Sequence, residues 1–206
     1  MDQNNQKETH PQDNLNHLQR LANFLFEAGM LRKTPRTGYQ FLGSGRENVA
    51  EHSFGAAVIG YVLAKLANAN EARTIFLCLF HDFAEARTGD FNYVNRLYNK
   101  CDPRAALQDA TCGTGLEGDL LAMWEELETD NTPEAKLAND ADQLDLILNL
   151  KEELDLGNPY AAKWLESAVQ RLVTPQAKQL AATILSTDHT DWWYKGPDKN
   201  WWVKPE

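Results

Sequence analysis

The segment from Phe76 to Asp90 constrains the fold more than any other part of this 206-residue chain. It opens with the apolar run Phe76-Leu77-Cys78-Leu79-Phe80 and continues directly into His81-Asp82. Such a run is typical of a buried helix, and burying an imidazole or a carboxylate is costly unless the group is paired or bound to a metal. The fold must therefore bring partners for His81 and Asp82 from elsewhere in the chain.

Length and composition narrow the class of protein. At roughly 150 residues per domain, the chain fits a single domain. A formal net charge of −10 repels polyanions, which argues against a nucleic-acid polymer as ligand but permits a small phosphate compound in a locally cationic pocket. There is no apolar run long enough to span a membrane, and the polar N-terminus does not resemble a signal peptide. Three cysteines without a CxxC pair indicate reduced thiols, so we expect a soluble, cytoplasmic protein with no membrane partner.

The pattern divides the chain into three parts. Residues 1–13 are rich in Gln, Asn and Asp without periodicity, and we expect a disordered lead-in. Residues 14–188 are expected to form the folded domain. Residues 189–206 form a tail with four tryptophans, which we expect to cover apolar surface on the domain or on a second copy of it.

Apolar residues recur at helical spacing, and no convincing run alternates as a strand would, so the predicted class is all-α. A first helix is expected from Asp13 to Gly29, packing by its leucines, with His10 and His17 at the surface. Residues 30–47 predict a long loop that carries four cations, and loops of this length tend to be functional. Further helices are expected over residues 71–86, 93–98, 102–110, 116–128 and 132–156, and after the Asn158-Pro159 and Thr174-Pro175 pairs.

Several potential metal ligands fall on the inner faces of these helices. His52 lies on the apolar stripe of a helix that ends near Ala67, and a later apolar helix carries Asp142 and Asp145. Together with His81 and Asp82 they form a mixed nitrogen and oxygen set, which suits a hydrolytic divalent metal such as Mn, Co, Ni, Fe, Zn or Mg. For the His-Asp dipeptide alone, a buried ion pair or a helix-end hydrogen bond is the alternative.

Three stretches carry a recognisable pattern, namely Asn48-Val49-Ala50-Glu51-His52-Ser53, Phe80-His81-Asp82-Phe83-Ala84-Glu85-Ala86-Arg87-Thr88-Gly89-Asp90 and Ala135-Lys136-Leu137-Ala138-Asn139-Asp140-Ala141-Asp142-Gln143. They resemble the HD-domain phosphohydrolases, and within them the 5'-deoxynucleotidase branch. The resemblance runs from about Leu18 to Gly157 and implies a single all-α HD-domain helical bundle with a metal site in its core.

The resemblance also implies roles for individual residues. One divalent metal ion would be held by His52, His81, Asp82 and Asp142. Glu85 matches the catalytic acid, Asp90 the carboxylate that contacts the sugar, and Arg36 the phosphate-binding arginine. The implied reaction is hydrolysis of (deoxy)nucleoside 5'-monophosphates to nucleoside and phosphate. The residue after Arg36 is Thr37, where some deoxynucleotidases have an aromatic residue, so the sugar preference stays open.

Other interpretations are weaker. Two-metal HD enzymes need extra histidine ligands, and none occurs between Asp82 and His189. A triphosphohydrolase or a guanosine-tetraphosphate hydrolase would carry a longer signature. The chain could act on a different small phosphate ester, or serve as a non-catalytic interaction module, although such modules lose metal ligands that this chain retains. The resemblance and the aromatic tail both favour a homodimer. Arg87 is expected to be a surface or ion-pair residue.

Overall fold

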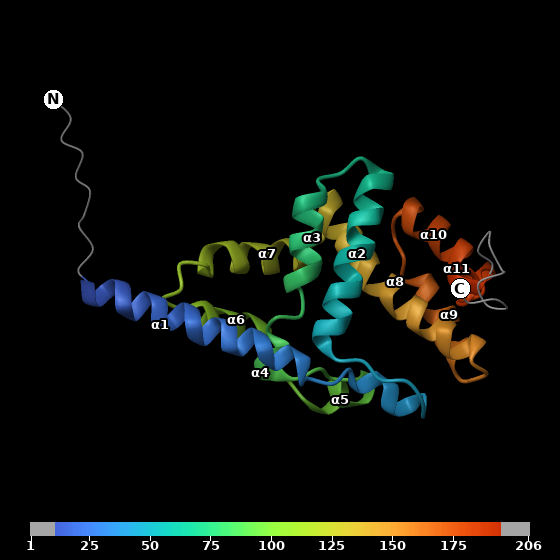
Figure 1. The fold of residues 1–206 in the computed structure, drawn as a ribbon, viewed down its shortest axis with the longest axis horizontal. Coiled ribbons are helices and arrows are strands. Elements are labelled where there is room, and N and C mark those ends of the chain that lie inside the picture. Colours follow the sequence, from blue (N-terminus) through green and yellow to red (C-terminus); the bar gives the residue numbers. More distant parts are fainter. Residues whose placement is uncertain (1–10, 195–206) are drawn as a thin grey trace, which may run out of the picture.

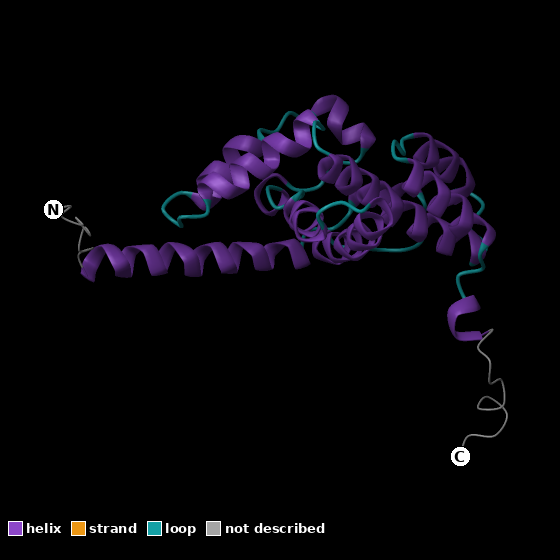
Figure 2. Cartoon of the chain, turned by 90° about the horizontal axis from the view of Figure 1, so that it is seen from above, coloured by secondary structure: helices purple, strands orange, loops and turns teal. Residues whose placement is uncertain are grey.

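The computed structural model describes residues 11–194, and this part of the chain is helical with no strand, which confirms the all-α class (Figure 1, Figure 2). The α-helices are α1 (Pro11–Ala28), α2 (Val49–Ala67), α3 (Glu71–Phe80), α4 (Glu85–Thr88), α5 (Tyr93–Tyr98), α6 (Pro103–Thr111), α7 (Glu117–Thr129), α8 (Pro133–Asp155), α9 (Ala161–Gln170), α10 (Pro175–Ser186) and α11 (Asp191–Tyr194). Two 3₁₀ turns, η1 (Gly29–Arg32) and η2 (Thr37–Phe41), lie in the predicted loop.

The centre of the molecule is formed by α2, α3 and α8, which pack on one another (Figure 1). Their contact surface is made of fully buried aliphatic side chains, among them Leu63, Leu77, Leu144 and Ile147. Burying one such side chain contributes about 1.5–3 kcal/mol, so this cluster holds the three helices in fixed positions. His52 lies on α2, Asp142 and Asp145 lie on α8, and His81 and Asp82 directly follow α3.

Most helix starts follow the predicted capping pattern. Asn48 and Glu51 form a reciprocal capping box at the start of α2, and Asp102, Thr132 and Thr174 each accept a backbone hydrogen bond at a Pro-started helix. A helix follows Asn158-Pro159 as predicted, but this pair does not cap it, because α9 begins at Ala161 with Tyr160 at the N-cap position. The Asn158 amide instead donates to the carbonyl of Leu42 at 3.0 Å, so this residue ties the turn to the loop before α2.

The helix predicted over residues 71–86 ends earlier than expected. α3 stops at Phe80, and residues 81–84 form turns before α4 begins at Glu85. Short-range hydrogen bonds tighten this segment, including Phe83 N to Phe80 O and Glu85 N to Asp82 O, both 3.0 Å. Phe83 is thereby buried and stacks on Phe24 of α1, with ring centroids 4.7 Å apart. The buried aromatic contact explains why the chain leaves the helical path here.

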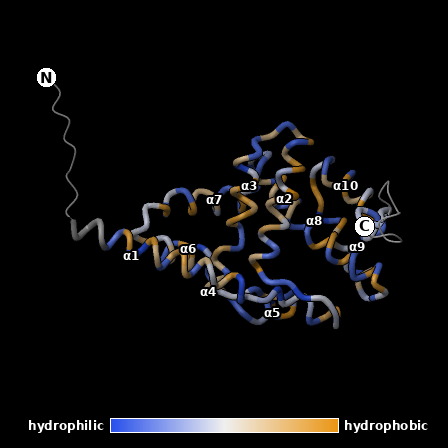
Figure 3. Tube along the Cα trace, in the orientation of Figure 1, coloured by the Kyte–Doolittle hydropathy of each residue, from blue (hydrophilic) through white to orange (hydrophobic). Residues whose placement is uncertain are grey.

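The first helix packs differently from the prediction. It begins at Pro11, two residues before the predicted cap, and protrudes from the central helices in both ribbon views (Figure 1, Figure 2). Although Phe24 is buried, Leu18, Leu25 and Phe26 are 60%, 70% and 80% exposed. Figure 3 shows hydrophobic residues recurring along α1 away from the centre. Periodicity identified an apolar face, but it cannot say what covers that face.

Parts of the terminal predictions lie outside the described residues, namely the lead-in up to residue 10 with His10, and the tail from residue 195. Within the described tail, Trp192 is 85% exposed, and His17 is exposed as predicted. None of the helices described is both long enough and apolar enough to cross a membrane. All three cysteines are free thiols, with Cys78 buried and the other two exposed.

Candidate metal centre and active site

Two histidines meet in the centre of the fold. His52 lies in the first turn of α2 and is fully buried, and His81 immediately follows α3. Their Nε2 atoms are 3.1 Å apart, with the rings edge to face. The close packing of α2 against α3 therefore brings together two imidazoles that are well separated in the sequence.

The other ring nitrogens determine the protonation of this pair. His81 Nδ1 lies 2.7 Å from the carbonyl oxygen of Cys78, and His52 Nδ1 lies 2.7 Å from Asp145 Oδ2. A carbonyl and a carboxylate oxygen accept hydrogen bonds, so each Nδ1 carries a proton and donates it. In the neutral rings, both Nε2 atoms then present lone pairs to each other. Such an arrangement is favourable when a cation, either a proton or a metal ion, lies between them.

Two carboxylates complete the cluster. Asp82 Oδ2 is 3.1 Å from His81 Nε2, and Asp142 Oδ1 is 3.0 Å from His52 Nε2. Burial opposes protonation of His52, but the carboxylates of Asp142 and Asp145 outweigh it and raise the His52 pKa to about 10. Burial also opposes the charge on Asp142, but His52, His81 and Arg36 hold the pKa of this carboxyl well below its usual range. The donor set and its demand for positive charge fit a divalent metal ion.

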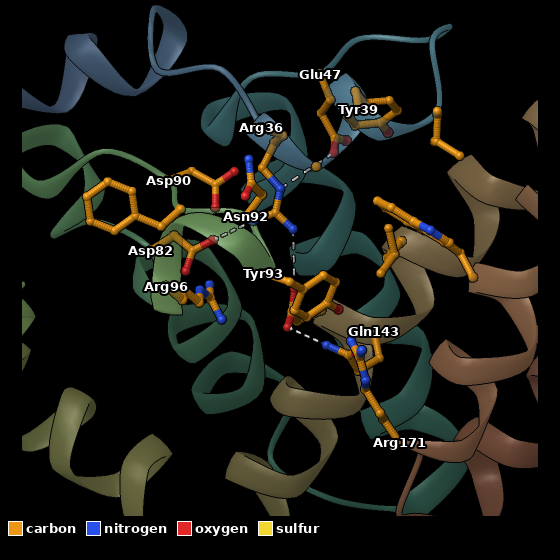
Figure 4. Close-up of a pocket in the computed structure, with 16 residues that line it drawn as sticks. Arg36, Tyr39, Glu47, Asp82, Asp90, Asn92, Tyr93, Arg96, Gln143 and Arg171 are labelled. Atoms are coloured by element: carbon orange, nitrogen blue, oxygen red, sulfur yellow. Dashed lines mark hydrogen bonds and ion pairs between the residues drawn. The ribbon is translucent and has the colours of Figure 1, made fainter. Parts of the chain in front are cut away.

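Arg36 reaches this cluster from the loop before α2 (Figure 4). Its guanidinium lies 3.2 Å from Asp82 Oδ2, 3.9 Å from Asp142 Oδ1 and 3.9 Å from Glu47 Oε2. The loop is held by the hydrogen bond from Arg36 N to Glu47 O at 2.9 Å and by an isolated bridge between Pro35 and Asn48. The long cationic loop predicted from the sequence thus positions one arginine at the proposed metal site.

Asp90 is tied to the same loop. Thr37 N donates to Asp90 Oδ2 at 2.6 Å, and Thr37 Oγ1 donates to the Asp90 carbonyl oxygen at 3.1 Å. The same hydroxyl accepts a hydrogen bond from Asn92 N at 2.9 Å. Thr37 therefore joins the loop to the segment after α4, which gives the threonine a structural role. Asp90 lines the cleft while one of its carboxylate oxygens is engaged.

Glu85 lies at the start of α4 with an unusual environment. Its Oε2 atom is buried and has no hydrogen-bond partner among the described residues. Burial, followed by the nearby charges of Asp82 and Asp90, raises the Glu85 pKa to about 9. A carboxyl group in this environment keeps its proton at neutral pH.

A cleft of about 170 Å³ opens over the cluster (Figure 4). Its wall includes four of the seven predicted site residues, namely Arg36, Asp82, Asp90 and Asp142. The two histidines and Glu85 do not form part of this wall. The structure thus brings the seven predicted residues into one neighbourhood, with the three aspartates and the arginine facing the cleft.

Comparison with known proteins identifies the family. A model of the HD domain family matches residues 28–184. The chain belongs to the HD domain family. The 5'-deoxynucleotidase HDDC2 of Bos taurus is 33% identical over 172 residues, covering 80% of this chain and 83% of the relative. The 5'-deoxynucleotidase PBPRA2627 of Photobacterium profundum is 30% identical over 161 residues, covering 68% and 81%.

The solved structures agree on the fold. A conserved hypothetical protein from Pyrococcus furiosus superposes with a TM-score of 0.70 at 21% identity, covering 81% of this chain and 99% of that protein. The resemblance to HD-domain proteins of the 5'-deoxynucleotidase branch, first seen in the sequence motifs, is confirmed.

Sequence reasoning missed several residues of this HD domain. Asp145 was weighed as a possible metal ligand, but the structure places it behind His52, at the nitrogen that points away from the cluster. The cleft wall also contains Gln143, the last residue of the third motif, and the side chains of Tyr93, Arg96, Trp164 and Arg171. No local motif marks the last four, because long-range packing brings them to the cleft. Arg87 forms ion pairs with Glu27 and, at 3.7 Å, Asp109, as expected for a structural residue.

Gly55 makes the contact between His52 and Asp145 possible. A Cβ atom at this position of α2 would overlap Asp145 Oδ1 and lie 3.0 Å from Asp145 Cγ. Any larger residue must therefore displace the carboxylate that orients His52.

We predict that Gly55→Ala lowers metal affinity by about 10- to 100-fold, the usual cost of losing a group that orients a histidine ligand. Metal titration of the purified protein, with bound metal measured by elemental analysis, checks this. Gly118→Ala is the matched control, because Gly118 lies in α7 with nothing within 4 Å of an added Cβ. Parent-like metal affinity in Gly55→Ala would contradict the role given to Asp145.

Proposed function

We propose that this HD domain is a metal-dependent phosphomonoesterase that hydrolyses deoxynucleoside 5'-monophosphates to nucleoside and phosphate. The observation that carries the proposal is the convergence of two imidazole Nε2 atoms and two carboxylates beneath a cleft that also holds Arg36. The relatives named 5'-deoxynucleotidase support the choice of substrate, since the matches span 83% and 81% of their lengths.

In this proposal one divalent ion is held by His52, His81, Asp82 and Asp142. When bound, the ion supplies Lewis-acid chemistry, polarising a phosphoryl oxygen and making water a better nucleophile. The donor set accepts Mn, Co, Mg, Ni, Fe or Zn, so the identity of the metal is left open. Asp145 and the Cys78 carbonyl orient the two imidazoles toward the ion through their Nδ1 protons.

Three further residues act on the substrate. Arg36 contacts the phosphate and offsets its negative charge, which is why a guanidinium at the cleft wall matters. Glu85 supplies a proton to the 5' oxygen as the phosphorus–oxygen bond breaks, and its raised pKa suits this role. Asp90 faces the sugar with the carboxylate oxygen that Thr37 does not engage. Water provides the oxygen that ends on inorganic phosphate.

A phosphate-release assay on a panel of nucleoside 5'-monophosphates, with Mn, Co or Mg added, tests the proposed reaction. We expect metal-dependent release from deoxynucleotides and at least a hundredfold loss in His81→Ala, since a metal ligand is removed. The parallel ribonucleotides establish the sugar preference. The proposed function fails if no member of the panel loses phosphate, or if His81→Ala releases it as fast as the parent does.

Glu85→Gln separates proton transfer from metal binding. The amide has nearly the same shape as the carboxyl group but cannot act as an acid, so we expect kcat to fall by about two to four powers of ten. Metal content should stay at the parent level, because Glu85 is not a proposed ligand. Glu128→Gln, an exposed acid of α7, is the matched control and should keep full turnover. Retained turnover in Glu85→Gln would mean that another group donates the proton to the 5' oxygen.

We also propose that the chain forms a homodimer through the exposed apolar residues of α1 and η1. These residues, which we call the α1 patch, are Leu18, Leu25, Phe26 and Met30. An apolar face of this kind on a protruding helix is typical of a protein–protein contact.

A cytoplasmic location is likewise proposed, supported by three thiols that form no disulfide. Cell fractionation tests the location.

Phe26→Asp should convert the dimer into a monomer, because a charge at an 80% exposed patch residue would be buried in the contact. Sedimentation velocity at micromolar protein measures this directly. The control is Tyr160→Asp, which places the same charge at a 70% exposed aromatic outside the patch. A monomeric parent, or an unchanged dimer in Phe26→Asp, would rule out the α1 patch as the interface.

A further inference from the structure

The cleft over the proposed metal centre adjoins a second hollow. This hollow, of about 330 Å³, lies between α5, α8 and α9 and shares Tyr93, Leu146, Trp164 and Arg171 with the cleft. Because the same four side chains line both, the two spaces adjoin. A ligand anchored beside Arg36 and Asp82 can reach this shared wall, since Tyr93 and Trp164 also line the cleft.

The shared wall is aromatic. The rings of Tyr93 and Trp164 lie edge to face with centroids 6.4 Å apart, and the Phe41 ring is tilted against Trp164 with centroids also 6.4 Å apart. Tyr93 is 50% exposed, so much of its surface is free to contact a ligand. Aromatic walls of this kind accept flat rings by offset or edge-to-face contact.

Hydrogen bonds connect this wall to the proposed metal site. Gln143 Nε2 donates to Asp142 Oδ2 at 2.8 Å, and Arg171 Nη1 donates to Gln143 Oε1 at 3.3 Å. The Arg171 guanidinium then lies over the Tyr93 ring, 5.1 Å from its centroid. Figure 4 shows Tyr93, Gln143 and Arg171 together on one side of the pocket, with Asp82 and Asp90 on the other. The aromatic wall thus has a fixed position relative to the phosphate end.

We propose that Tyr93 and Trp164 form the subsite for the nucleobase, which stacks on their rings while the phosphate lies at Arg36. The proposal rests on the function proposed above and adds the part of the substrate that the metal centre does not contact. A base is the flat aromatic group that a nucleotide presents at the end opposite its phosphate. Stacking is tolerant of base identity, because every base has an aromatic face. The subsite therefore favours nucleotides over sugar phosphates and discriminates weakly among the bases.

The test compares substrates with and without a base. Parent protein and the variant Tyr93→Leu are assayed on dAMP, dCMP and 2-deoxyribose 5-phosphate. We expect Tyr93→Leu to lower kcat/KM for both nucleotides by roughly fivefold to a hundredfold, mainly through KM, as expected for a lost base–aromatic contact. Hydrolysis of 2-deoxyribose 5-phosphate should be unchanged. Tyr98→Leu is the matched control, since Tyr98 lies on the same helix, is 83% exposed and lines neither hollow.

Trp164→Phe provides a second variant that keeps an aromatic ring in the half-buried position. It should retain the preference for nucleotides to a larger extent than Trp164→Leu. Thermal unfolding and metal content, measured for each variant, identify any loss that reflects the fold. Equal losses on nucleotides and on the sugar phosphate, or no loss on either, would overturn the base subsite.

Binding measurements separate this proposal from the function itself. Calorimetric titration with dAMP and with 2-deoxyribose 5-phosphate, in the His81→Ala background, measures the contribution of the base without turnover. Tighter binding of dAMP that is lost in Tyr93→Leu supports the subsite even if the parent releases no phosphate, in which case only the proposed reaction fails. Equal affinity for the two ligands would overturn the subsite even if the nucleotides are hydrolysed.

Discussion

Hydrogen bonds at the Nδ1 atoms of His52 and His81 orient the two imidazoles, and the chemistry of the candidate site depends on that orientation. Asp145 and the Cys78 carbonyl accept the Nδ1 protons of His52 and His81, so both Nε2 lone pairs point to one place. This arrangement requires that α2 approach α8 closely at Gly55 and that the chain leave α3 at Phe80. The packing of the central helices therefore also sets the geometry of the candidate metal centre.

The charge distribution around the cleft gives the proposed metal ion a second purpose. Burial opposes the charge on Arg36, but the neighbouring carboxylates of Asp82, Asp142 and Asp90 keep its guanidinium charged. A phosphate dianion would be repelled by this acidic group of residues, and a single arginine does not balance them. A divalent cation changes the sign of the local field, so it serves substrate binding as well as catalysis.

The sequence predicts the helices and the polar cluster well, because both depend on local patterns. His52 follows from its place on an apolar stripe, and His81 and Asp82 from their place after a buried run. Details that depend on contacts between distant segments were not predictable. The role of Asp145 depends on the approach of two helices, Trp164 meets Tyr93 only in the folded chain, and the exposure of Leu25 depends on what covers α1. The end of α3 was missed because Phe83 finds a buried partner in Phe24.

The loop that carries Arg36 has a further consequence for binding strength. Its ends are closed by the Pro35–Asn48 bridge, and Thr37 fastens its middle to Asp90 and Asn92. The conformational entropy of these residues is thus lost when the chain folds and not when a ligand arrives. An arginine on an unconstrained loop would lose that entropy on each binding event, at about 1–2 kcal/mol for every backbone position ordered. Preorganisation allows a small cleft to bind a small anion with little rearrangement.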